Sequence, residues 1–268
     1  MNRIDLKFKE LKVKKQKALI VYLTCGYPDL KTTEKLVLEL ESRGADIIEL
    51  GVPFSDPLAD GPVIQESSSY ALKKGINLKQ IFFLVRSLRK NTQIPICLMG
   101  YYNPVFSFGP VKFVREALSS GVDGIIIPDL PPEEDQELVS LSKKRGLKTI
   151  FFLSPTSSRE RIKYVSRVSS GFIYYVSLTG VTGARQNLPL DLKENIRIVK
   201  SYTEKPVCVG FGISRPEHIA GVFRIADGAI VGSALIKLIK DNLGKVDLIR
   251  KAGRFIKGLS KKCTKNLN

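Results

Sequence analysis

Between residues 47 and 62 the chain reads Ile47-Ile48-Glu49-Leu50-Gly51-Val52-Pro53-Phe54-Ser55-Asp56-Pro57-Leu58-Ala59-Asp60-Gly61-Pro62. The first four residues form an apolar run, which is typical of a strand covered on both faces. An acid, Glu49, lies at the end of this run, and a loop with two further acids follows. Because burying a carboxylate is costly unless it is paired or protonated, Glu49 indicates a tuned proton donor or acceptor. The alternative is a strand-end glutamate turned to solvent.

Similar apolar runs alternate with amphipathic stretches along the whole chain. The runs are Ala18–Leu23, Ala45–Leu50, Ile94–Met99, Gly124–Ile127, Thr149–Leu153, Gly171–Val176, Pro206–Val209 and Gly228–Val231. The helical patterns include Thr32–Arg43, Val111–Leu118, Glu134–Arg145 and Ser158–Val168, with Gly44, Gly121, Gly146 and Gly171 as helix stops. Extra helices are expected at Asn2–Lys14 and, after the second strand, at Leu78–Lys90. The pattern predicts an α/β fold of eight parallel strand–helix units.

Glycine-rich turns decide between a closed barrel and an open doubly wound sheet. They follow the sixth, seventh and eighth expected strands, at Gly180–Gly183, Gly210–Gly212 and Gly232-Ser233. Barrels commonly hold phosphate with late loops, whereas a dinucleotide-binding sheet has its glycine motif after an early strand. The sequence therefore predicts a single (β/α)8 TIM barrel. The alternative for each turn is a tight strand-to-helix connection.

Length and composition fit one soluble barrel. The chain has 268 residues, of which 43% are hydrophobic and 26% are charged. No apolar run approaches the ~18 residues that cross a bilayer, and Met1–Lys7 lacks the core of a secretory signal. We therefore expect a cytoplasmic protein that has no membrane partner. Since no linker or composition break divides the chain, we expect one domain over residues 1–268, with a polar basic tail from about residue 258.

The net charge of +17 invites a second class of function, a basic noncatalytic protein that binds nucleic acid. The lysines are spread over helical segments without interleaved aromatics, and no nucleic-acid-binding motif is present. Solvated helix faces are the better explanation, so no nucleic-acid partner is expected. The four cysteines, Cys25, Cys97, Cys208 and Cys263, form no C-x-x-C pair that would indicate zinc or a redox dithiol.

In a barrel, the side chains that face substrate follow the carboxyl ends of the strands. That rule selects acids, phenols and the glycine turns, but no histidine. The only histidine, His218, lies at the start of a helical segment, where a solvent-side or capping role is expected. Acid–base chemistry therefore falls to carboxylates, with Glu49 and Asp60 as the candidate pair. Asp60 alternatively orders its loop, and Asp129 alternatively caps a helix that begins near Glu133.

Seven segments, in order, resemble the tryptophan synthase α subunit family. They are Leu23–Asp29, Glu49–Gln65, Met99–Pro104, Pro128–Glu134, Tyr174–Arg185, Gly210–Ser214 and Gly232–Ala234. The block P-F-S-D-P-x-A-D-G-P at Pro53–Pro62 is highly specific to that family. The resemblance implies a barrel that cleaves indole-3-glycerol phosphate to indole and glyceraldehyde 3-phosphate without a cofactor of its own and without a metal. It also implies an α2β2 assembly with a β subunit that holds pyridoxal phosphate and receives the indole. A different phosphate-binding barrel, an isomerase or epimerase, is the alternative enzyme.

The resemblance also implies roles for individual residues. Glu49 matches the general acid–base and Asp60 its partner at the indole nitrogen. The substrate pocket matches Tyr22, Tyr101, Ile126, Asp129, Tyr174, Thr182 and Phe211, and the phosphate site matches Gly183, Gly212, Gly232 and Ser233. The polar stretch Gly183–Pro189 is expected to be a lid that closes over substrate, with Thr182 at its hinge. The face that carries the lid, with Asp56 and the loop around Asn103-Pro104, is expected to dock the β subunit.

Overall fold

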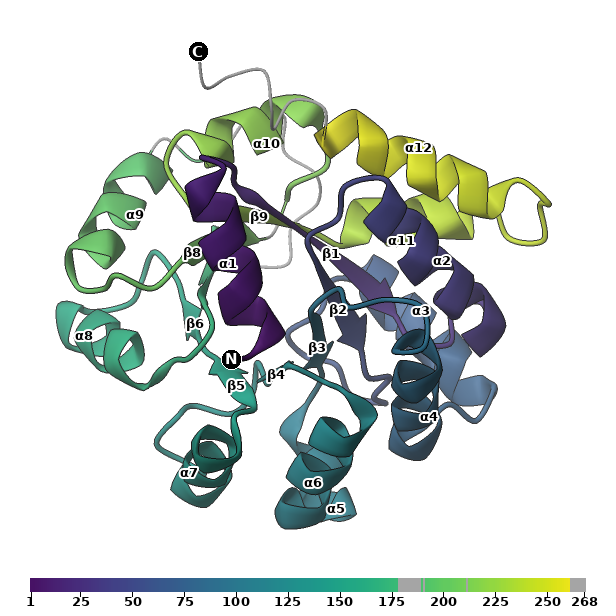
Figure 1. Ribbon diagram of the computed structural model, residues 1–268, viewed down its shortest axis with the longest axis horizontal. Coiled ribbons are helices and arrows are strands. Elements are labelled where there is room, and N and C mark those ends of the chain that lie inside the picture. The colour runs from purple at the N-terminus through teal and green to yellow at the C-terminus, as the bar shows by residue number, and fades with distance from the viewer. Residues whose placement is uncertain (178–188, 190, 211, 261–268) are drawn as a thin grey trace.

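The computed structural model describes residues 1–177, 189, 191–210 and 212–260. Its strands are β1 (Ala18–Thr24), β2 (Ile47–Gly51), β3 (Ile96–Met99), β4 (Gly124–Ile126), β5 (Lys148–Ile150), β6 (Phe152–Leu153), β7 (Ile173–Val176), β8 (Val207–Gly210) and β9 (Gly228–Val231). Its helices are α1 (Arg3–Val13), α2 (Leu30–Ser42), α3 (Pro62–Lys73), α4 (Leu78–Leu88), α5 (Tyr102–Phe108), α6 (Pro110–Ser120), α7 (Gln136–Arg145), α8 (Arg159–Val168), α9 (Leu192–Ser201), α10 (Pro216–Phe223), α11 (Ser233–Lys240) and α12 (Leu248–Ser260). Helices surround the strands, as Figure 1 shows.

The strands form one parallel sheet that curves into a barrel. Their order is β5-β4-β3-β2-β1-β9-β8-β7-β6, and neighbouring strands pair in parallel. The two ends of this order, β5 and β6, are separated in the chain only by Phe151. The carbonyl of Phe151 accepts a hydrogen bond from the Tyr174 amide at 3.0 Å, so the fifth expected strand joins both edges of the sheet. The predicted TIM barrel is therefore confirmed, with its fifth strand divided into β5 and β6.

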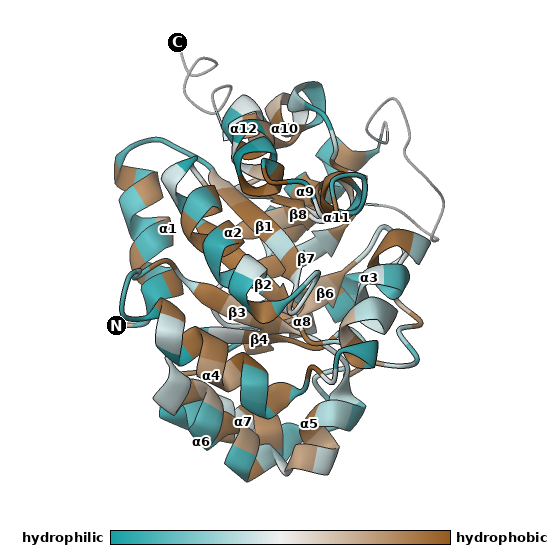
Figure 2. Ribbon diagram, turned by 90° about the vertical axis from the view of Figure 1, so that its right-hand side faces the viewer, coloured by the Kyte–Doolittle hydropathy of each residue, from teal (hydrophilic) through white to brown (hydrophobic). Residues whose placement is uncertain are grey.

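Strand register separates an inner face from an outer face. Glu49 pairs with Tyr22 on β1 and with Cys97 on β3, and paired residues point to the same side of a sheet. Cys97 in turn pairs with Gly124 of β4. The alternate residues Ile48 and Leu50 face the helices and are fully buried there. Covering on both faces explains why the strands are apolar throughout, as the brown centre of Figure 2 shows.

Helix α1, the expected first extra helix, covers the amino-terminal mouth of the barrel (Figure 1). Its side chain Ile4 is fully buried. A Cβ atom built on Gly124 would lie 3.0 Å from Cδ1 of Ile4, so Ile4 reaches the inner face of the sheet. Helix α1 thus closes this end of the barrel with an apolar side chain.

Side chains shortly before β2, β4, β7 and β9 accept hydrogen bonds from amides at the start of β1, β3, β5 and β8. The carboxylate of Asp46 accepts from the Leu19 amide at 2.8 Å, that of Asp123 from Ile96 at 2.9 Å, and that of Asp227 from Val207 at 3.0 Å; the Ser170 hydroxyl accepts from Thr149 at 2.8 Å. Each bond satisfies an amide at the start of a strand. This contact repeats around the barrel and holds together the two strands of each pair.

Most expected helix boundaries agree with the structure to within two residues. Asn2, Asp29, Asn77 and Ser158 accept bonds from first-turn amides as N-caps. Gly121 and Gly146 are left-handed C-caps, and Gly44 directly follows the C-cap Arg43 of α2. Gly171 does not end its helix, because the C-cap of α8 is Ser169. Helix α12 extends to Ser260, past the expected start of a tail at residue 258.

Candidate active site

Glu49 is the central group of the site. It lies on the inner face of β2 and is 0% exposed, so the solvent-side alternative is wrong. Within the part of the chain that the structure describes, neither carboxylate oxygen has a hydrogen-bond partner. Burial raises the pKa of Glu49 to about 8. A carboxyl in this environment carries a proton at neutral pH and can donate it.

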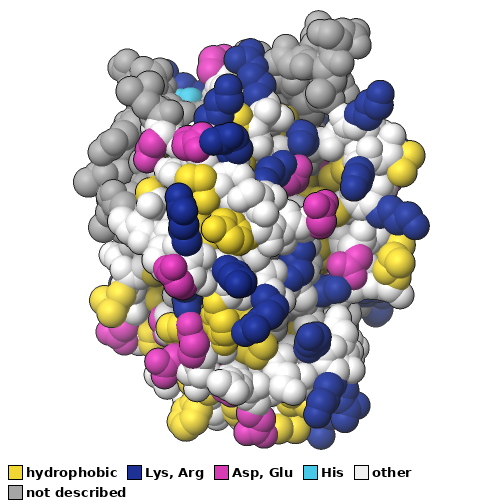
Figure 3. Space-filling view, turned by 90° about the vertical axis from the view of Figure 1, so that its left-hand side faces the viewer, with side chains coloured by type: hydrophobic (Ala, Val, Ile, Leu, Met, Phe, Trp, Pro, Cys, Tyr) yellow, Lys and Arg dark blue, Asp and Glu magenta, His cyan; other side chains and the backbone are white. Residues whose placement is uncertain are grey.

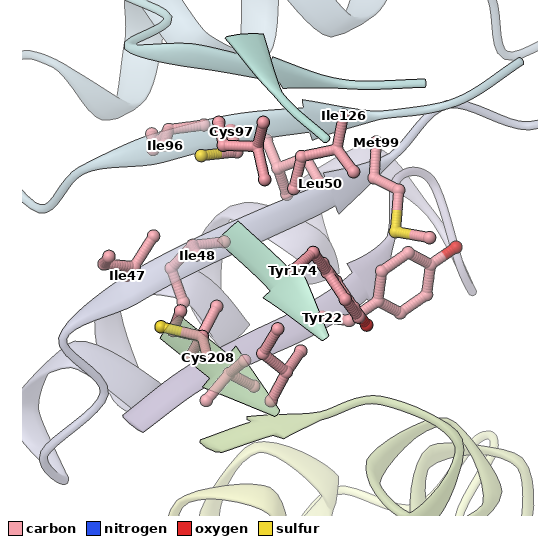
Figure 4. Packing of buried hydrophobic residues seen from close by; sticks show 14 of the residues in the cluster. Tyr22, Ile47, Ile48, Leu50, Ile96, Cys97, Met99, Ile126, Tyr174 and Cys208 are labelled. Carbon is pink, nitrogen blue, oxygen red and sulfur yellow. The ribbon is translucent and has the colours of Figure 1, made fainter. Parts of the chain in front are cut away.

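Two phenols, Tyr22 and Tyr174, lie near each other toward the carboxyl ends of β1 and β7 (Figure 4). Tyr22 pairs with Glu49 in the β1–β2 register. Glycines two positions along the inner face of a neighbouring strand make room for their rings. A Cβ atom on Gly51 would lie 2.1 Å from the Tyr22 hydroxyl, and one on Gly210 would lie 2.5 Å from the Tyr174 hydroxyl. Both rings therefore need the glycine opposite them.

Asp60 shares this pocket with Glu49. Burial raises the pKa of both phenols, and the negative charges of Asp60 and Glu49 raise it further, so both acids lie near both rings. Burial raises the pKa of Asp60 itself to about 6, against a hydrogen bond from the Tyr101 hydroxyl that lowers it. The two carboxyls thus differ in proton affinity, which is the arrangement that acid–base chemistry needs.

The loop that carries Asp60 is held in place by Tyr101. The Tyr101 hydroxyl accepts from the Ala59 amide at 2.9 Å, and its ring stacks on Phe54 with centroids 5.2 Å apart. Asp60 also has the loop-ordering contacts of its alternative role, because its amide bonds the Pro57 carbonyl and its own carbonyl accepts from the Gln65 amide group. These contacts use its backbone, so its carboxylate stays available to the pocket.

Asp129 caps a helix, but not the expected one. Its carboxylate accepts from the Tyr102 amide at 2.9 Å, at the start of α5. The helix expected near Glu133 begins instead at Gln136, with Asp135 as its N-cap. Asp129 contributes to the raised pKa of Tyr101, so it lies at the same end of the barrel as the other acids.

The remaining described candidates surround the same end. Ile126 is fully buried on the inner face of β4, where it pairs with Met99 and Ile150. Gly232 is the N-cap residue of α11, and a Cβ atom there would lie 3.3 Å from Cβ of Tyr22. Ser233 is the first residue of that helix, and Gly212 has a positive φ of 75°. The glycine turns after β8 and β9 therefore adjoin the phenol pocket.

Some expected site residues lie outside the described part of the chain. They are Thr182, Gly183 and Phe211, together with the proposed lid except Pro189, and also Cys263 of the tail. The segment around Asn103-Pro104, expected to be a loop, belongs to helix α5.

His218 is 4% exposed, so a solvent-side role is wrong, and its Nδ1 accepts from the Ser214 amide at 3.4 Å, a local backbone contact near the start of α10. Among the described residues no group of three or more His, Cys, Asp or Glu side chains could hold a metal ion. In the same part of the chain, none of the helices has both the length and the apolar character to cross a bilayer.

Comparison with known proteins gives the family. The family profile described as tryptophan synthase alpha chain matches residues 8–262. The chain belongs to the tryptophan synthase alpha chain family. It is 50% identical over 259 residues to the tryptophan synthase alpha chain of Geotalea uraniireducens, covering 97% of each chain. It is 52% identical over 259 residues to that of Citrifermentans bemidjiense, again covering 97% of each.

Solved structures agree with the family assignment. The tryptophan synthase alpha chain of Legionella pneumophila superposes with a TM-score of 0.90 at 38% identity, covering 98% of this chain and 97% of that one. A chain of the tryptophan synthase complex of Pyrococcus furiosus gives a TM-score of 0.85 at 38% identity, covering 92% and 99%. The family assignment removes the two alternatives, another barrel isomerase and a noncatalytic nucleic-acid-binding protein.

Sequence reasoning missed several residues that shape the pocket. Phe54 supports Tyr101, the Ser68 hydroxyl accepts from the Phe54 amide at 2.9 Å, and Cys97 lies next to Glu49 on the inner face. Once the register of β2 and β3 is known, Cys97 is placed inside the barrel because it pairs with Glu49. The serine contact had no sequence signal, because it depends on how α3 packs on the loop.

Proposed function

We propose that this chain performs the retro-aldol cleavage of indole-3-glycerol phosphate to indole and glyceraldehyde 3-phosphate, with Glu49 and Asp60 as its catalytic groups. The observation that carries the proposal is a fully buried carboxyl without a hydrogen-bond partner among the described residues, beside a second carboxyl of lower pKa. One group is suited to give a proton and the other to remain ionised.

Cleavage requires a proton at C3 of the indole, because the aryl carbon is otherwise a poor leaving group. Glu49 donates that proton, and the positive charge that develops is shared with the ring nitrogen. Ionised Asp60 stabilises this cation in a pocket from which water is largely excluded. Glu49, now a carboxylate, takes the proton of the hydroxyl on the adjacent side-chain carbon. The C–C bond breaks, the aldehyde forms, and Glu49 regains its proton.

Substrate binding is proposed to use the groups around these acids. Tyr22, Tyr101, Ile126, Asp129, Tyr174, Thr182 and Phe211 would contact the indole and glycerol parts. Gly183, Gly212, Gly232 and Ser233 would hold the phosphate. First-turn amides of a helix have no partner within the helix, and the helix dipole favours an anion there, which supports the start of α11 as part of the phosphate site. Remote phosphate binding would orient the reacting carbon.

A β subunit is the proposed partner, in an α2β2 assembly in which the partner holds pyridoxal phosphate and receives the indole. The structure solved from Pyrococcus furiosus is of a tryptophan synthase complex. The docking face would be the carboxyl end of the barrel, around Asp56 and α5. Leu58 and Phe106 are 89% and 63% exposed there, as an apolar docking face requires.

Indole release from indole-3-glycerol phosphate by the purified chain, with and without a β subunit, tests the proposed reaction directly. We expect slow release alone and faster release with the partner. No indole in either state, from protein that is folded by circular dichroism, would refute the reaction.

A further inference from the structure

Two buried cysteines lie on the inner face of the barrel near Glu49. Cys97 pairs with Glu49 in the β2–β3 register, so the two side chains point into the barrel at the same level. Both are 0% exposed. A Cβ atom on Gly124, the partner of Cys97 on β4, would lie 3.2 Å from the Cys97 Sγ, which places the thiol against the inner wall of the barrel. Cys208 on β8 is a second fully buried inner-face thiol.

A thiol fills space without solvating its neighbour. Its S–H is a weak donor and its sulfur a weak acceptor, whereas a serine hydroxyl of similar shape would donate a strong bond to a carboxylate. Both oxygens of the Glu49 carboxyl lack a partner within the described residues. An orphaned buried carboxyl is costly, so its persistence here points to a function.

The other polar groups around Glu49 point elsewhere. The Tyr22 hydroxyl lies over Gly51 and accepts from Thr24 Oγ1 at 3.4 Å. The Tyr174 hydroxyl lies over Gly210. Asp60, from the loop after β2, faces the phenols and Tyr101. Together with Cys97 and Cys208, these are the titratable groups that pack around Glu49 from β1, β3, β7, β8 and the loop.

We propose that Cys97 is a positioning residue for proton transfer, because a sulfur at this place leaves the Glu49 carboxyl without a hydrogen bond and so keeps it protonated before substrate binds. The proposal rests on the proposed role of Glu49 as the acid. Electrostatics agree with the geometry: burial and then the charge of Glu49 raise the pKa of the Cys97 thiol. Burial alone raises the pKa of Cys25, which is equally buried, to about 12.

The test is a direct titration of the Glu49 carboxyl in the substrate-free protein by infrared difference spectroscopy, with the band assigned by its loss in Glu49→Gln. In Cys97→Ser we expect the Glu49 pKa to fall by about one unit, a tenfold weaker proton affinity, because the new hydroxyl donates to the ionised form. Cys97→Ala adds no donor, so its Glu49 pKa should stay within about 0.3 units of the wild-type value. Cys25→Ser, the matched control, should also stay there.

Three outcomes would overturn the proposal: no shift in Cys97→Ser, an equal shift in Cys25→Ser, or an equal shift in Cys97→Ala, which would show that packing and not the hydroxyl sets the titration. If Cys97→Ser does not fold, Cys97→Thr makes the same exchange of a thiol for a hydroxyl, and the same three outcomes apply to it. The pH dependence of indole formation separates the two proposals. A titration that moves while the rate profile stays fixed would leave Cys97 as a tuning group and refute Glu49 as the acid.

Discussion

At the scale of single residues, the proposed reaction depends on two carboxyls in unlike surroundings. Glu49 is enclosed by the barrel wall, and its pKa is raised to about 8. Asp60 is itself only partly exposed on a largely exposed loop and keeps the Tyr101 hydroxyl as a donor, so its pKa is raised only to about 6. Between these values one group is protonated and the other ionised, which is the combination that the proposed cleavage needs.

The pH dependence of kcat/KM follows from that pair. Activity should rise as Asp60 ionises near pH 6 and fall as Glu49 ionises near pH 8, because kcat/KM reports the free enzyme. Steady-state indole formation between pH 5 and 10 measures both limbs. A profile that stays flat up to about pH 10 would show that no acid with a raised pKa takes part.

Stability should depend on pH through the same residue. The Glu49 pKa rises from 4.5 to about 8 on folding, so the folded state binds this proton more tightly than the unfolded chain. Its stabilising contribution is present below about pH 4.5 and is lost as the pH rises to about 8. Glu49→Gln lacks this loss. As the pH rises between these values, its free energy of unfolding should therefore increase relative to that of wild type by a few kcal/mol, at about 1.4 kcal/mol per pKa unit. Urea denaturation at pH 5 and pH 9 measures it; equal pH dependence in both proteins would contradict it.

At the scale of elements, the sequence predicted the strands well because both faces are buried and the apolar runs are continuous. It did not predict the break at Phe151, which depends on how the barrel closes. The sequence around Pro104 favours a loop, whereas the structure has a helix there, α5. A proline in the first turn of a helix is tolerated, since its missing amide would have no partner there. The sequence places Asp129 just before a helical segment, which favours a cap of that helix. Its actual contact, with the Tyr102 amide, depends on how two neighbouring strand ends lie together.

The ties between strands give a prediction at this scale. Asp123, 3% exposed, bonds the Ile96 amide and pairs with Arg89 at 2.8 Å and Arg3 at 3.1 Å. Asp123→Ala leaves Arg89 buried without this carboxylate and should cost about 3–5 kcal/mol. Glu194→Ala also removes a carboxylate from an arginine pair, but an exposed one, and should leave the urea midpoint close to that of wild type. Equal urea midpoints for the two variants would contradict the role of the buried tie.

At the scale of the whole molecule, we propose that the single sheet and its helices form one domain with its chemistry at the carboxyl end of the strands. The sequence predicted this end for the site because parallel strands bring their following loops together. It could not predict which inner side chains are neighbours, such as Cys97 and Glu49, because that requires the register. The charge of +17 is spread over the surface, and the face in Figure 3 shows lysines and arginines dispersed among acids. The structure gives no mechanistic reason for this charge.

Dispersed charge and a local phosphate site make different predictions. Gly232→Asp places a carboxylate at the start of α11 and should raise KM at least about tenfold, by repelling the phosphate. Lys143→Asp changes charge on the exposed last turn of α7, which leads into the amino-terminal end of β5, and should leave KM unchanged. Equal rises in KM would mean that bulk charge and not this turn binds the phosphate.

The rate of cleavage by Glu49→Gln tests the central claim most directly. Single-turnover indole formation should fall by roughly 10²–10⁴-fold, because the amide cannot give or take the proton, while affinity for a substrate analogue stays within about threefold of wild type. Cleavage within threefold of the wild-type rate, at unchanged analogue binding, would contradict the account.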